Sequence, residues 1–344
     1  MNSMILTIAI PTYKRALYLK QAIQSAINQE NVEIKYNVIV VNNDPETDME
    51  SFKTEFSNAP IKIDFYTNET NLGMLGNVNR CVELSQGKYI AFLHDDDLLL
   101  PNYIQSVQKI IQSEEVSCLI PERYLLFETT KNEQRVNLEK KKRIKRNVIN
   151  LLTLGCLFQK NISEIKPVDN VFSWQNCYGA PSCGVVFNKS SIKKHGLFFP
   201  EGTLSWDYYS FLHLNEKEKM YILHKPVSVY RMTTGLSLKP QTQLDFFESY
   251  EVVKNRFGNN KLTEKFISKY SREISYLNAT VLGREGKNLA KNKNYKIVDR
   301  YPSKVKFLAF MLKRLFYYSW HNLDVEIPLD KNGYKTLKKM NVIK

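Results

Sequence analysis

The stretch that decides the fold is residues 88–101, Lys-Tyr-Ile-Ala-Phe-Leu-His-Asp-Asp-Asp-Leu-Leu-Leu-Pro. Tyr89 to Leu93 is a short apolar run rich in aromatic and branched residues, which is typical of a buried central strand in an α/β sheet. Three adjacent carboxylates, Asp95 to Asp97, follow this strand. Because neighbouring carboxylates repel one another, a cation among them favours their full ionisation. The pattern predicts a cation-binding strand end, and the alternative is an acidic turn that caps the helix begun at Pro101.

The ligand expected at this strand end carries phosphate together with a hard metal ion. Carboxylate oxygens suit Mg²⁺ or Mn²⁺, which proteins hold through one or two carboxylates while water and substrate phosphates complete the coordination shell. In open α/β sheets, ligands bind outside the carboxyl ends of the strands. We therefore expect Mn²⁺ or Mg²⁺ as the cofactor at this acidic cluster.

Strands and helices alternate through the first hundred residues. Apolar runs at Leu6 to Ile10, Val38 to Val41 and Ile61 to Tyr66 each end in a polar loop, and apolar residues at helical spacing follow the first and third loops. This alternation predicts a mostly parallel sheet with right-handed crossovers. The loops after these strands and the acidic cluster after Leu93 therefore open on one edge of one sheet.

Composition sets limits on compartment and class. The chain has 344 residues, enough for one large α/β domain and an appendage, and its five cysteines form no Cys-x-x-Cys pair. A reducing cytoplasm fits this cysteine pattern best. The apolar run Ile5 to Ile10 is too short for a signal peptide, and no window of about 20 residues is apolar throughout. Neither a Gly-x-Gly-x-x-Gly nor a phosphate-loop motif occurs, which disfavours dinucleotide-binding oxidoreductases and phosphate-loop NTPases.

Four motifs in order carry a family resemblance. They are Ile-Pro-Thr-Tyr-Lys-Arg at 10–15, Val-Ile-Val-Val-Asn-Asn-Asp at 38–44, Asn-Leu-Gly-Met-Leu-Gly-Asn-Val-Asn at 71–79, and Gly-Lys-Tyr-Ile-Ala-Phe-Leu-His-Asp-Asp-Asp at 87–97. Together they resemble the start of a bacterial, inverting family 2 glycosyltransferase. The resemblance implies a GT-A α/β fold, with a mostly parallel central sheet flanked by helices, in residues 1–237. A basic, mainly helical C-terminal extension would occupy residues 238–344.

The resemblance also implies site residues. The loop after the first strand would hold the nucleoside, with Tyr13 against the base and Arg15 near phosphate. Asp96 matches the metal-binding Asp of the family, and Asp97 is the second expected metal ligand. The expected nucleotide-sugar contacts are Pro11, Thr12, Tyr13, Arg15, Asn42, Asn43, Asn71, Gly73, Asn79, Asp95, Asp96 and Arg231.

Three positions depart from the family pattern. Asn42 stands where the family usually has an Asp that pairs with uracil, although an Asn carbonyl still accepts a bond from a pyrimidine N3–H. His94 stands where many members have the first Asp of an Asp-x-Asp motif. Thr233 stands where a His often follows the closing Tyr-Arg, so either the third metal ligand is missing and metal binding is weaker, or His224 or a water substitutes for it. Arg231 either touches the diphosphate or serves as a structural ion-pair partner.

Asp207 is the candidate catalytic residue. Leu204, Tyr208, Phe211 and Leu212 have helical spacing, so Asp207 lies at or near the first turn of a helix, where a carboxylate is stabilising by about 0.5–1 kcal/mol without any catalytic role. The resemblance aligns Trp206-Asp207 with a Glu-Asp pair whose Asp is the general base. In an inverting transfer, such a base takes the proton from the acceptor hydroxyl as that oxygen attacks the anomeric carbon.

The C-terminal part is basic, with 22 Lys and Arg against 10 Asp and Glu from Leu236 to Lys344. Lys304 to Trp320 is aromatic and basic together, and it predicts either a helix packed on the transferase domain or an interfacial helix on an anionic membrane leaflet. A second basic run, Lys140 to Arg146, is either a solvated face or a site for an anionic acceptor or membrane. No recognition motif for nucleic acid occurs.

The sequence therefore predicts a metal-dependent inverting hexosyltransferase in polysaccharide biosynthesis of the cell envelope. Its donor would be a nucleotide-diphosphate sugar, with a UDP-sugar favoured, and its acceptor a glycan or lipid-linked hydroxyl. The location would be the cytoplasm or the inner face of the membrane, and the oligomeric state is open. One alternative is a non-catalytic sugar-nucleotide or glycan-binding subunit. Another, a nucleotidyltransferase, needs a Gly-rich loop after the first strand, where this chain has Pro-Thr-Tyr-Lys-Arg.

Overall fold

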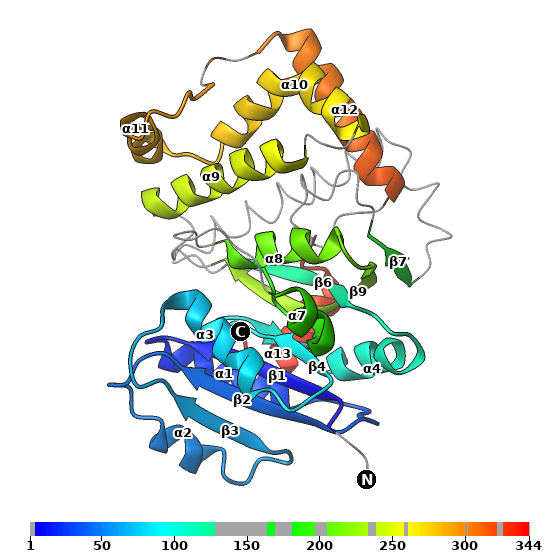
Figure 1. Ribbon diagram of the computed structural model, residues 1–344. Coiled ribbons are helices and arrows are strands. Elements are labelled where there is room, and N and C mark those ends of the chain that lie inside the picture. The colour runs from blue at the N-terminus through cyan, green and yellow to red at the C-terminus, as the bar shows by residue number, and fades with distance from the viewer. Residues whose placement is uncertain are drawn as a thin grey trace.

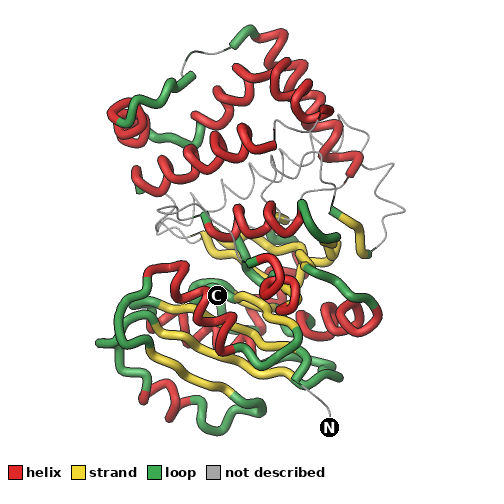
Figure 2. The backbone as a smooth tube through the Cα atoms, viewed as in Figure 1, coloured by secondary structure: helices red, strands yellow, loops and turns green. Residues whose placement is uncertain are grey.

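The computed structural model describes residues 4–127, 164–168, 181–196, 205–232, 239–257, 261–298, 300, 302–321 and 326–343. A twisted sheet with flanking helices occupies the lower half of Figure 1, and a group of helices, α9 to α12, lies at its top. Figure 2 shows the same division, with most strands below and the long helices above. The basic run Lys140 to Arg146 and Thr233 lie outside the described residues.

The first half of the sheet is parallel, as the sequence predicts. Its strands are β1 (Leu6–Thr12), β2 (Tyr36–Asn42), β3 (Ile63–Thr67) and β4 (Tyr89–Phe92), in the spatial order β3-β2-β1-β4. Thr12 pairs with Asn42, and Asn42 with Thr67, so the last residues of three strands lie side by side. The loops that follow these strands therefore open on the same edge, which is where the sequence analysis placed a ligand.

The second half of the sheet mixes directions. The order continues from β4 through β8 (Val186–Asn188), β6 (Cys118–Phe127) and β9 (Met220–Met232) to β5 (Leu98–Leu99). β8 is antiparallel to both of its neighbours, whereas β6 and β9 are parallel to each other. Two short strands, β7 (Ile165–Pro167) and β10 (Glu326–Pro328), pair with β9 and β6 respectively.

Helices cover both faces of the sheet because side chains along each strand alternate between faces. Ile8 and Ile10 of β1 belong to the core cluster that includes α1 and α4, whereas Ala9 belongs to the opposite cluster with α3 and α8. The helices of this part are α1 (Ala16–Ile27), α2 (Glu50–Glu55), α3 (Gly73–Leu84), α4 (Tyr103–Ser113), α7 (Lys189–His195) and α8 (Trp206–Asn215).

The C-terminal part is mainly helical, as expected, but its last segment returns to the sheet. Its helices are α9 (Pro240–Phe257), α10 (Lys261–Ala279), α11 (Arg284–Asn292), α12 (Lys304–His321) and α13 (Lys331–Lys339). Tyr270 of α10 and Phe310 of α12 share a buried cluster with Phe211 of α8. Strand β10 pairs with β6, and Leu337 of α13 is buried in a cluster with residues of β5 and β6. The domain boundary near residue 238 stays a prediction. Strand β10 and helix α13 lie after this boundary in the sequence but pack on the sheet of the first part.

Two expected helices are present in the structure. The helix expected to begin at Pro101 begins two residues later, at Tyr103, and the helix expected around Asp207 begins at Trp206. No helix within the described ranges has both the length and the apolar character that crossing a bilayer requires. Cys81, Cys118 and Cys183 are buried free thiols.

Candidate active site

The acidic residues lie in a tight turn at the end of β4. Leu93 N donates to the carbonyl of Ala9 (3.0 Å), which aligns the turn with the end of β1, and Asp97 N donates to the carbonyl of His94 (3.0 Å). The turn leaves Asp96 partly exposed and buries Asp95 and Asp97. Backbone hydrogen bonds of the protein itself therefore hold the acidic turn, residues 94–97, in place.

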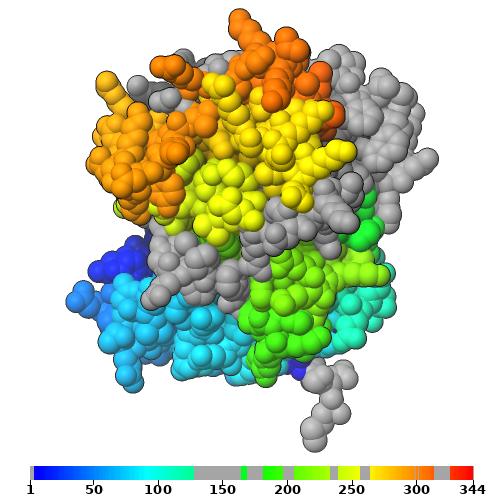
Figure 3. All heavy atoms as spheres, turned by 45° about the horizontal axis from the view of Figure 1, so that its top comes forward, coloured from blue at the N-terminus to red at the C-terminus, as the bar shows by residue number. Residues whose placement is uncertain are grey.

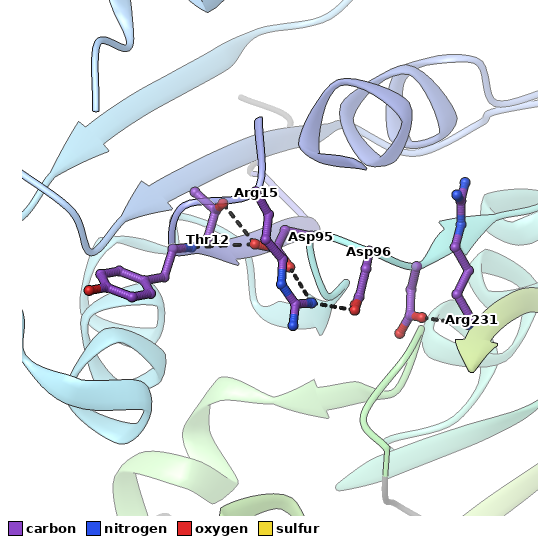
Figure 4. A network of polar contacts seen from close by, with 7 residues as sticks. Thr12, Arg15, Asp95, Asp96 and Arg231 are labelled. Carbon is purple, nitrogen blue, oxygen red and sulfur yellow. Dashed lines mark hydrogen bonds and ion pairs between the residues drawn. The ribbon is translucent and has the colours of Figure 1, made fainter. Parts of the chain in front are cut away.

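Asp95 ties the acidic turn to the loop after β1 (Figure 4). Its Oδ2 accepts hydrogen bonds from Thr12 Oγ1 (2.8 Å) and from Tyr13 N (3.3 Å). Arg15 Nη1 lies 3.4 Å from Asp95 Oδ1 and also contacts Asp96 Oδ2. Burial and then the charge of Asp96 raise the pKa of Asp95 to about 6, although Arg15 opposes both effects. The structure thus brings together Thr12, Tyr13, Arg15, Asp95 and Asp96.

Asp97 points into the protein. Its Oδ1 accepts the backbone N–H of Arg231 (2.9 Å), and the buried thiol of Cys183 is a side-chain partner that lowers the pKa of this carboxyl group. Burial, and then the charge of Asp96, raise the pKa of Asp97 well above its usual range. A buried carboxylate in this condition is suited to a cation placed between it and Asp96.

The Arg231 side chain leads away from the acidic turn, as Figure 4 shows. Its Nη2 donates to Gln21 Oε1 of α1, and its guanidinium carbon lies 5.2 Å from the ring centre of Tyr18. The side chain is 4% exposed. Of the two roles that the sequence leaves open for Arg231, this geometry corresponds to the structural one, with the backbone N–H serving Asp97.

A network of asparagines joins the ends of β2 and β3 to the start of α3. Asn43 Nδ2 donates to Asn71 Oδ1 (2.8 Å) and to the carbonyl of Gly73 (3.1 Å). Asn43 Oδ1 accepts from Asn68 Nδ2 (3.0 Å) and from Leu72 N (2.9 Å). The backbone N–H of Asn43 donates to the carbonyl of Thr12 (2.9 Å), so the network also reaches the loop after β1. Gly73 has φ 70°, which favours glycine at the first position of α3.

Asn42 and Asn79 hold positions other than those the resemblance implies. Both polar groups of the Asn42 side chain close a turn, because Nδ2 donates to the carbonyl of Asp44 (2.7 Å) and Oδ1 accepts from Asp44 N (3.0 Å). Asn42 is 1% exposed, so it shapes the loop after β2 from inside. Asn79 is exposed on α3, whereas Asn77, two residues earlier, is buried in the asparagine network. Pro11 lies in β1 opposite Val41.

The Tyr13 ring is accessible at the edge of the site, where it is 45% exposed. Lys14, the next residue, has φ 56°, a left-handed conformation that is uncommon for lysine. Lys14 Nζ lies 5.3 Å from the ring centre of Tyr13 and 3.8 Å from Asp44 Oδ1. This arrangement leaves one aromatic face near the strand ends for stacking on a planar ligand.

Asp207 lies in the first turn of α8 and is linked to the acidic turn through Ser182. Tyr208 N donates to Asp207 Oδ1 (2.9 Å), and the backbone N–H of Ser182 also donates to this carboxylate. Ser182 Oγ forms a 2.8 Å hydrogen bond with His94 Nε2. Burial raises the pKa of Asp207 to about 6, although these N–H groups and the charge of Arg123 lower it. Burial also lowers the pKa of His94, which favours a neutral ring there.

The residues present fit a divalent cation that two protein carboxylates hold and whose coordination shell is completed mainly by substrate phosphates and water. No group of three or more His, Cys, Asp or Glu side chains in the described part of the chain has the arrangement of a metal site. Asp96 and Asp97 offer carboxylate oxygens, of which those of Asp96 are partly exposed and those of Asp97 are buried. A site with two protein carboxylates is what Mg²⁺ or Mn²⁺ uses when substrate phosphates complete the shell. His224, a substitute ligand suggested by the sequence, pairs instead with Glu122 (3.2 Å).

Residues 7–168 match the family described as Glycosyl transferase family 2. These residues include the ends of β1 to β4 and the acidic turn, while Asp207 and Arg231 lie beyond them. The chain carries a family 2 glycosyltransferase domain. The match covers the four motifs on which the sequence analysis rested, and it confirms the family that they indicated.

Curated relatives share the glycosyltransferase domain at moderate identity. An uncharacterized glycosyltransferase of Methanocaldococcus jannaschii is 31% identical over 114 residues, 33% of this chain and 39% of that protein. A GalNAc(5)-diNAcBac-PP-undecaprenol beta-1,3-glucosyltransferase of Campylobacter jejuni is 23% identical over 289 residues, 79% of this chain and 82% of that protein. The matched region spans only 39% of the M. jannaschii protein and 40% of an uncharacterized Mycobacterium tuberculosis relative.

Solved glycosyltransferases resemble nearly the whole chain in fold. Staphylococcus aureus TarS 1–349 in complex with UDP-GlcNAc has a TM-score of 0.57 at 14% identity, covering 93% of this chain and 90% of that chain. The mannosyltransferase PcManGT from Pyrobaculum calidifontis, in complex with GDP-Man and Mn²⁺, has a TM-score of 0.52 at 13% identity, covering 98% and 86%. At such identities the likeness shows the fold alone, and the fold expected from the sequence, GT-A, is confirmed.

Four residues at the site were not among the contacts expected from the sequence, namely Asn68, Asn77, Arg123 and Ser182. Asn68 follows β3 as Asn42 ends β2, so a polar residue at a strand end was an available signal. Arg123 is fully buried in β6, where its Nη1 donates to the carbonyl of Pro181 (2.7 Å). A charged residue within an apolar strand was the signal for Arg123, and Ser182 lies in a sequence segment, Gly179 to Phe187, that resembles the family's segment leading into the acceptor site. The choice of Asn77 over Asn79 follows only from the three-dimensional contacts.

Proposed function

We propose that the chain transfers a hexose, with inversion, from a nucleotide-diphosphate sugar to a hydroxyl of a glycan or lipid-linked acceptor. The observation that carries the proposal is the link between two carboxylate groups. His94 of the acidic turn hydrogen-bonds to Ser182, and the Ser182 backbone donates to Asp207. An inverting transfer needs one acidic group at the leaving diphosphate and another at the attacking hydroxyl, and this geometry supports both roles.

The donor would bind across the loops after β1, β2 and β3. Tyr13 offers an exposed ring for the base, and the asparagine network holds the loops after β2 and β3 in one shape. Arg15, which pairs with Asp95 and Asp96 in this structure, is the cation placed to meet a phosphate. A UDP-sugar is the favoured donor, and the UDP-GlcNAc complex of TarS 1–349 supports a site of this class.

Asp96 and Asp97 would hold a divalent cation. When bound, Mn²⁺ or Mg²⁺ would neutralise charge that develops on the diphosphate. The GDP-Man and Mn²⁺ complex of PcManGT supports the use of such a cation. The contribution of this chain is a fixed acidic turn, in which the Arg231 backbone N–H orients Asp97 through a bond of 2.9 Å.

Asp207 would act as the general base. With a pKa of about 6, its carboxylate is mostly ionised at neutral pH and remains basic enough to accept a proton from a hydroxyl. The N–H groups of Tyr208 and Ser182 fix its orientation. The acceptor oxygen would attack the anomeric carbon on the face opposite the diphosphate as the bond from that carbon to the diphosphate oxygen breaks. The proton of the acceptor hydroxyl would move to Asp207, and the nucleoside diphosphate would leave.

The acceptor and the location belong to the same proposal. The undecaprenol-linked substrate in the printed name of the C. jejuni relative supports a lipid-linked glycan as acceptor. Such an acceptor would place the enzyme at the inner face of the cytoplasmic membrane, in cell-envelope polysaccharide synthesis. Residues 1–237 would form the catalytic domain, with residues 238–344 as an extension that packs on it.

The test is a titration with UDP, GDP, TDP and CMP, with and without Mn²⁺, followed by sugar transfer from the donor so identified. Asp96→Ala should abolish the metal-dependent part of diphosphate binding. Asp207→Asn should leave binding within about twofold but lower kcat by about 10²–10⁴-fold. Normal transfer by Asp207→Asn would refute the base. Binding of no nucleotide by the wild type would favour a glycan-binding subunit instead.

A further inference from the structure

Helix α12 packs on α10 through one face. Phe310 is fully buried, and its ring centre lies 5.5 Å from that of Tyr270 and 6.0 Å from that of Phe266. Phe307 contacts Tyr276 edge-on, at 5.6 Å between ring centres. One of the two alternatives for this helix, packing on the rest of the chain, therefore holds for this face.

The opposite face of α12 is apolar and exposed. Val305 is 79% exposed, Leu308 59% and Leu312 48%, and Ala309 is also exposed. At 3.6 residues per turn, positions 305, 308, 309 and 312 form one stripe along the helix. Single exposed apolar residues are ordinary, but a stripe of large aliphatic side chains marks a surface that meets another apolar phase.

Lysines border this stripe on both sides. Helical geometry places Lys304 on one side and Lys306 and Lys313 on the other, and all three are exposed. We call this surface, made of Lys304, Val305, Lys306, Leu308, Ala309, Leu312 and Lys313, the α12 face.

Helix α10 adds a basic row beside the α12 face. Lys265 and Lys269, one helical turn apart, are exposed on one side of α10, and Arg272 is exposed beyond a kink at Tyr270. Lys269 Nζ and Lys313 Nζ lie 5.7 and 5.8 Å from the same Tyr270 ring, which brings the row next to α12. Among described side chains of the two helices, the exposed acidic one is Glu264. Figure 3 shows α10 and α12 side by side on one face of the molecule.

We propose that the α12 face binds the surface of a bilayer that contains anionic phospholipids. An apolar stripe between lysines matches an interfacial helix, whose aliphatic side chains enter the acyl region while its cations meet lipid phosphates. The centre of the face is apolar, which a nucleic acid backbone would not use. A symmetric dimer through this face would set lysines against lysines, which is unfavourable.

A membrane surface would be a further partner of the proposed glycosyltransferase. This inference rests on the proposed function only for the benefit that membrane binding would bring. A lipid-linked acceptor is confined to the membrane plane, so a docked enzyme meets it at high effective concentration. The docking itself requires neither donor nor metal. Vesicle binding and nucleotide binding can therefore fail independently and be distinguished.

The experiment is flotation of the full-length chain with vesicles of phosphatidylcholine alone or with about 30 mol% phosphatidylglycerol, the membrane setting in which basic residues act. We expect binding to the anionic vesicles, weakened by high salt. The double variant Leu308→Gln/Leu312→Gln should bind the anionic vesicles at least roughly tenfold more weakly than the wild type does. Val252→Gln is the matched control, because Val252 is an aliphatic residue of α9 that is 46% exposed.

Charge has its own pair of variants. Lys304→Gln/Lys306→Gln should weaken anionic-vesicle binding by roughly fivefold per lysine. Lys335→Gln/Lys338→Gln removes the same charge from exposed positions of α13 and should bind as the wild type does. All variants should keep nucleotide binding and the wild-type circular dichroism spectrum.

Three results would overturn the inference. The first is wild-type protein that ignores both kinds of vesicle, and the second is a Leu308→Gln/Leu312→Gln variant that binds as tightly as the wild type. The third is a wild-type dimer in sedimentation velocity that this variant converts to monomer, because the occupant of the α12 face would then be a second copy of the chain.

Discussion

At the scale of single residues, one arginine balances the charge of the acidic turn. Arg15 contacts Asp95 and Asp96 with a side chain that is 32% exposed. It is the residue immediately before α1. A guanidinium and a divalent cation would both be attracted to the Asp96 carboxylate. The two therefore compete when no nucleotide is present, and a phosphate group would draw Arg15 away from Asp96.

Arg15→Ala should raise the affinity of the nucleotide-free protein for Mn²⁺ and lower its affinity for the diphosphate. Loss of a partly exposed competing ion pair is worth about 1 kcal/mol, or roughly a fivefold change in the Mn²⁺ dissociation constant. Titration calorimetry with Mn²⁺ alone, and then with UDP, measures both effects. Lys20→Ala is the control, because Lys20 lies on α1 but pairs with Glu55. A lower Mn²⁺ affinity in Arg15→Ala would contradict the competition.

Asp207 should give the reaction an acid limb near pH 6. Burial raises its pKa to about 6, and a general base works only in its ionised form, so kcat at saturating donor should fall as the pH drops through that value. Well below pH 6 the fall should approach about tenfold per pH unit. The donor dissociation constant, measured at each pH, separates this effect from titration of Asp95, whose pKa is also about 6. A kcat that stays constant from neutral pH to well below pH 6 would contradict the role of Asp207.

At the scale of elements, strand ends and loops are held to one another by amide side chains. Asn77 Nδ2 donates to the carbonyl of Val41 (3.0 Å), and Asn77 Oδ1 accepts from Asn68 (2.8 Å), so helix α3 is fastened to the ends of β2 and β3. Because Asn43 joins the same network to Thr12, three loops of the proposed donor site share one set of hydrogen bonds. A loss in one loop should therefore be felt in the others.

Asn77→Ala should destabilise the fold by about 1–3 kcal/mol, because it leaves buried polar partners without their hydrogen bonds. It should also weaken UDP binding, since the loops after β2 and β3 lose their fixed shape. Urea unfolding and calorimetric titration measure the two effects. Asn79→Ala makes the same exchange at an exposed position of α3, where stability should change by no more than about 0.5 kcal/mol. Equal effects of the two substitutions would show that the network has no special role.

The sequence predicts elements better than it predicts side-chain partners. Apolar runs such as Tyr89 to Leu93 and the loops after them follow from short-range pattern, and the structure confirms strands there. The choice between Asn77 and Asn79, or the direction of the Arg231 side chain, depends on which face of an element meets a distant neighbour. Asn77 and Asn79 point to nearly opposite sides of α3, and a motif match does not contain the information which of the two sides is buried.

At the scale of the whole molecule, residues 326–343 return from the C-terminal helices to the sheet. After the helices at the top of Figure 1, residues 326–328 form β10 and pair in parallel with β6 at Arg123 to Leu125. Helix α13 then buries Leu337 against a cluster with Leu98 and Tyr124. The sequence signal for this return is weak, because β10 is three residues long and ends in Pro328. The return makes the C-terminal segment part of the sheet that carries the proposed site.

Leu337→Ala should therefore destabilise the catalytic domain itself. Leu337 is fully buried, and its truncation should lower the free energy of unfolding by about 2–5 kcal/mol. Urea unfolding followed by tryptophan fluorescence, with UDP binding measured at each urea concentration, should show one transition for both properties at a lower midpoint. Leu312→Ala makes the same exchange on the α12 face, where Leu312 is 48% exposed, and should shift stability by no more than about 0.5 kcal/mol. If Leu337→Ala instead showed a separate transition at low urea while UDP binding kept its wild-type midpoint, α13 and β10 would fold independently of the sheet. A coincident transition would mean that the end of the chain and the nucleotide loops, at opposite ends of the sequence, unfold as one cooperative unit.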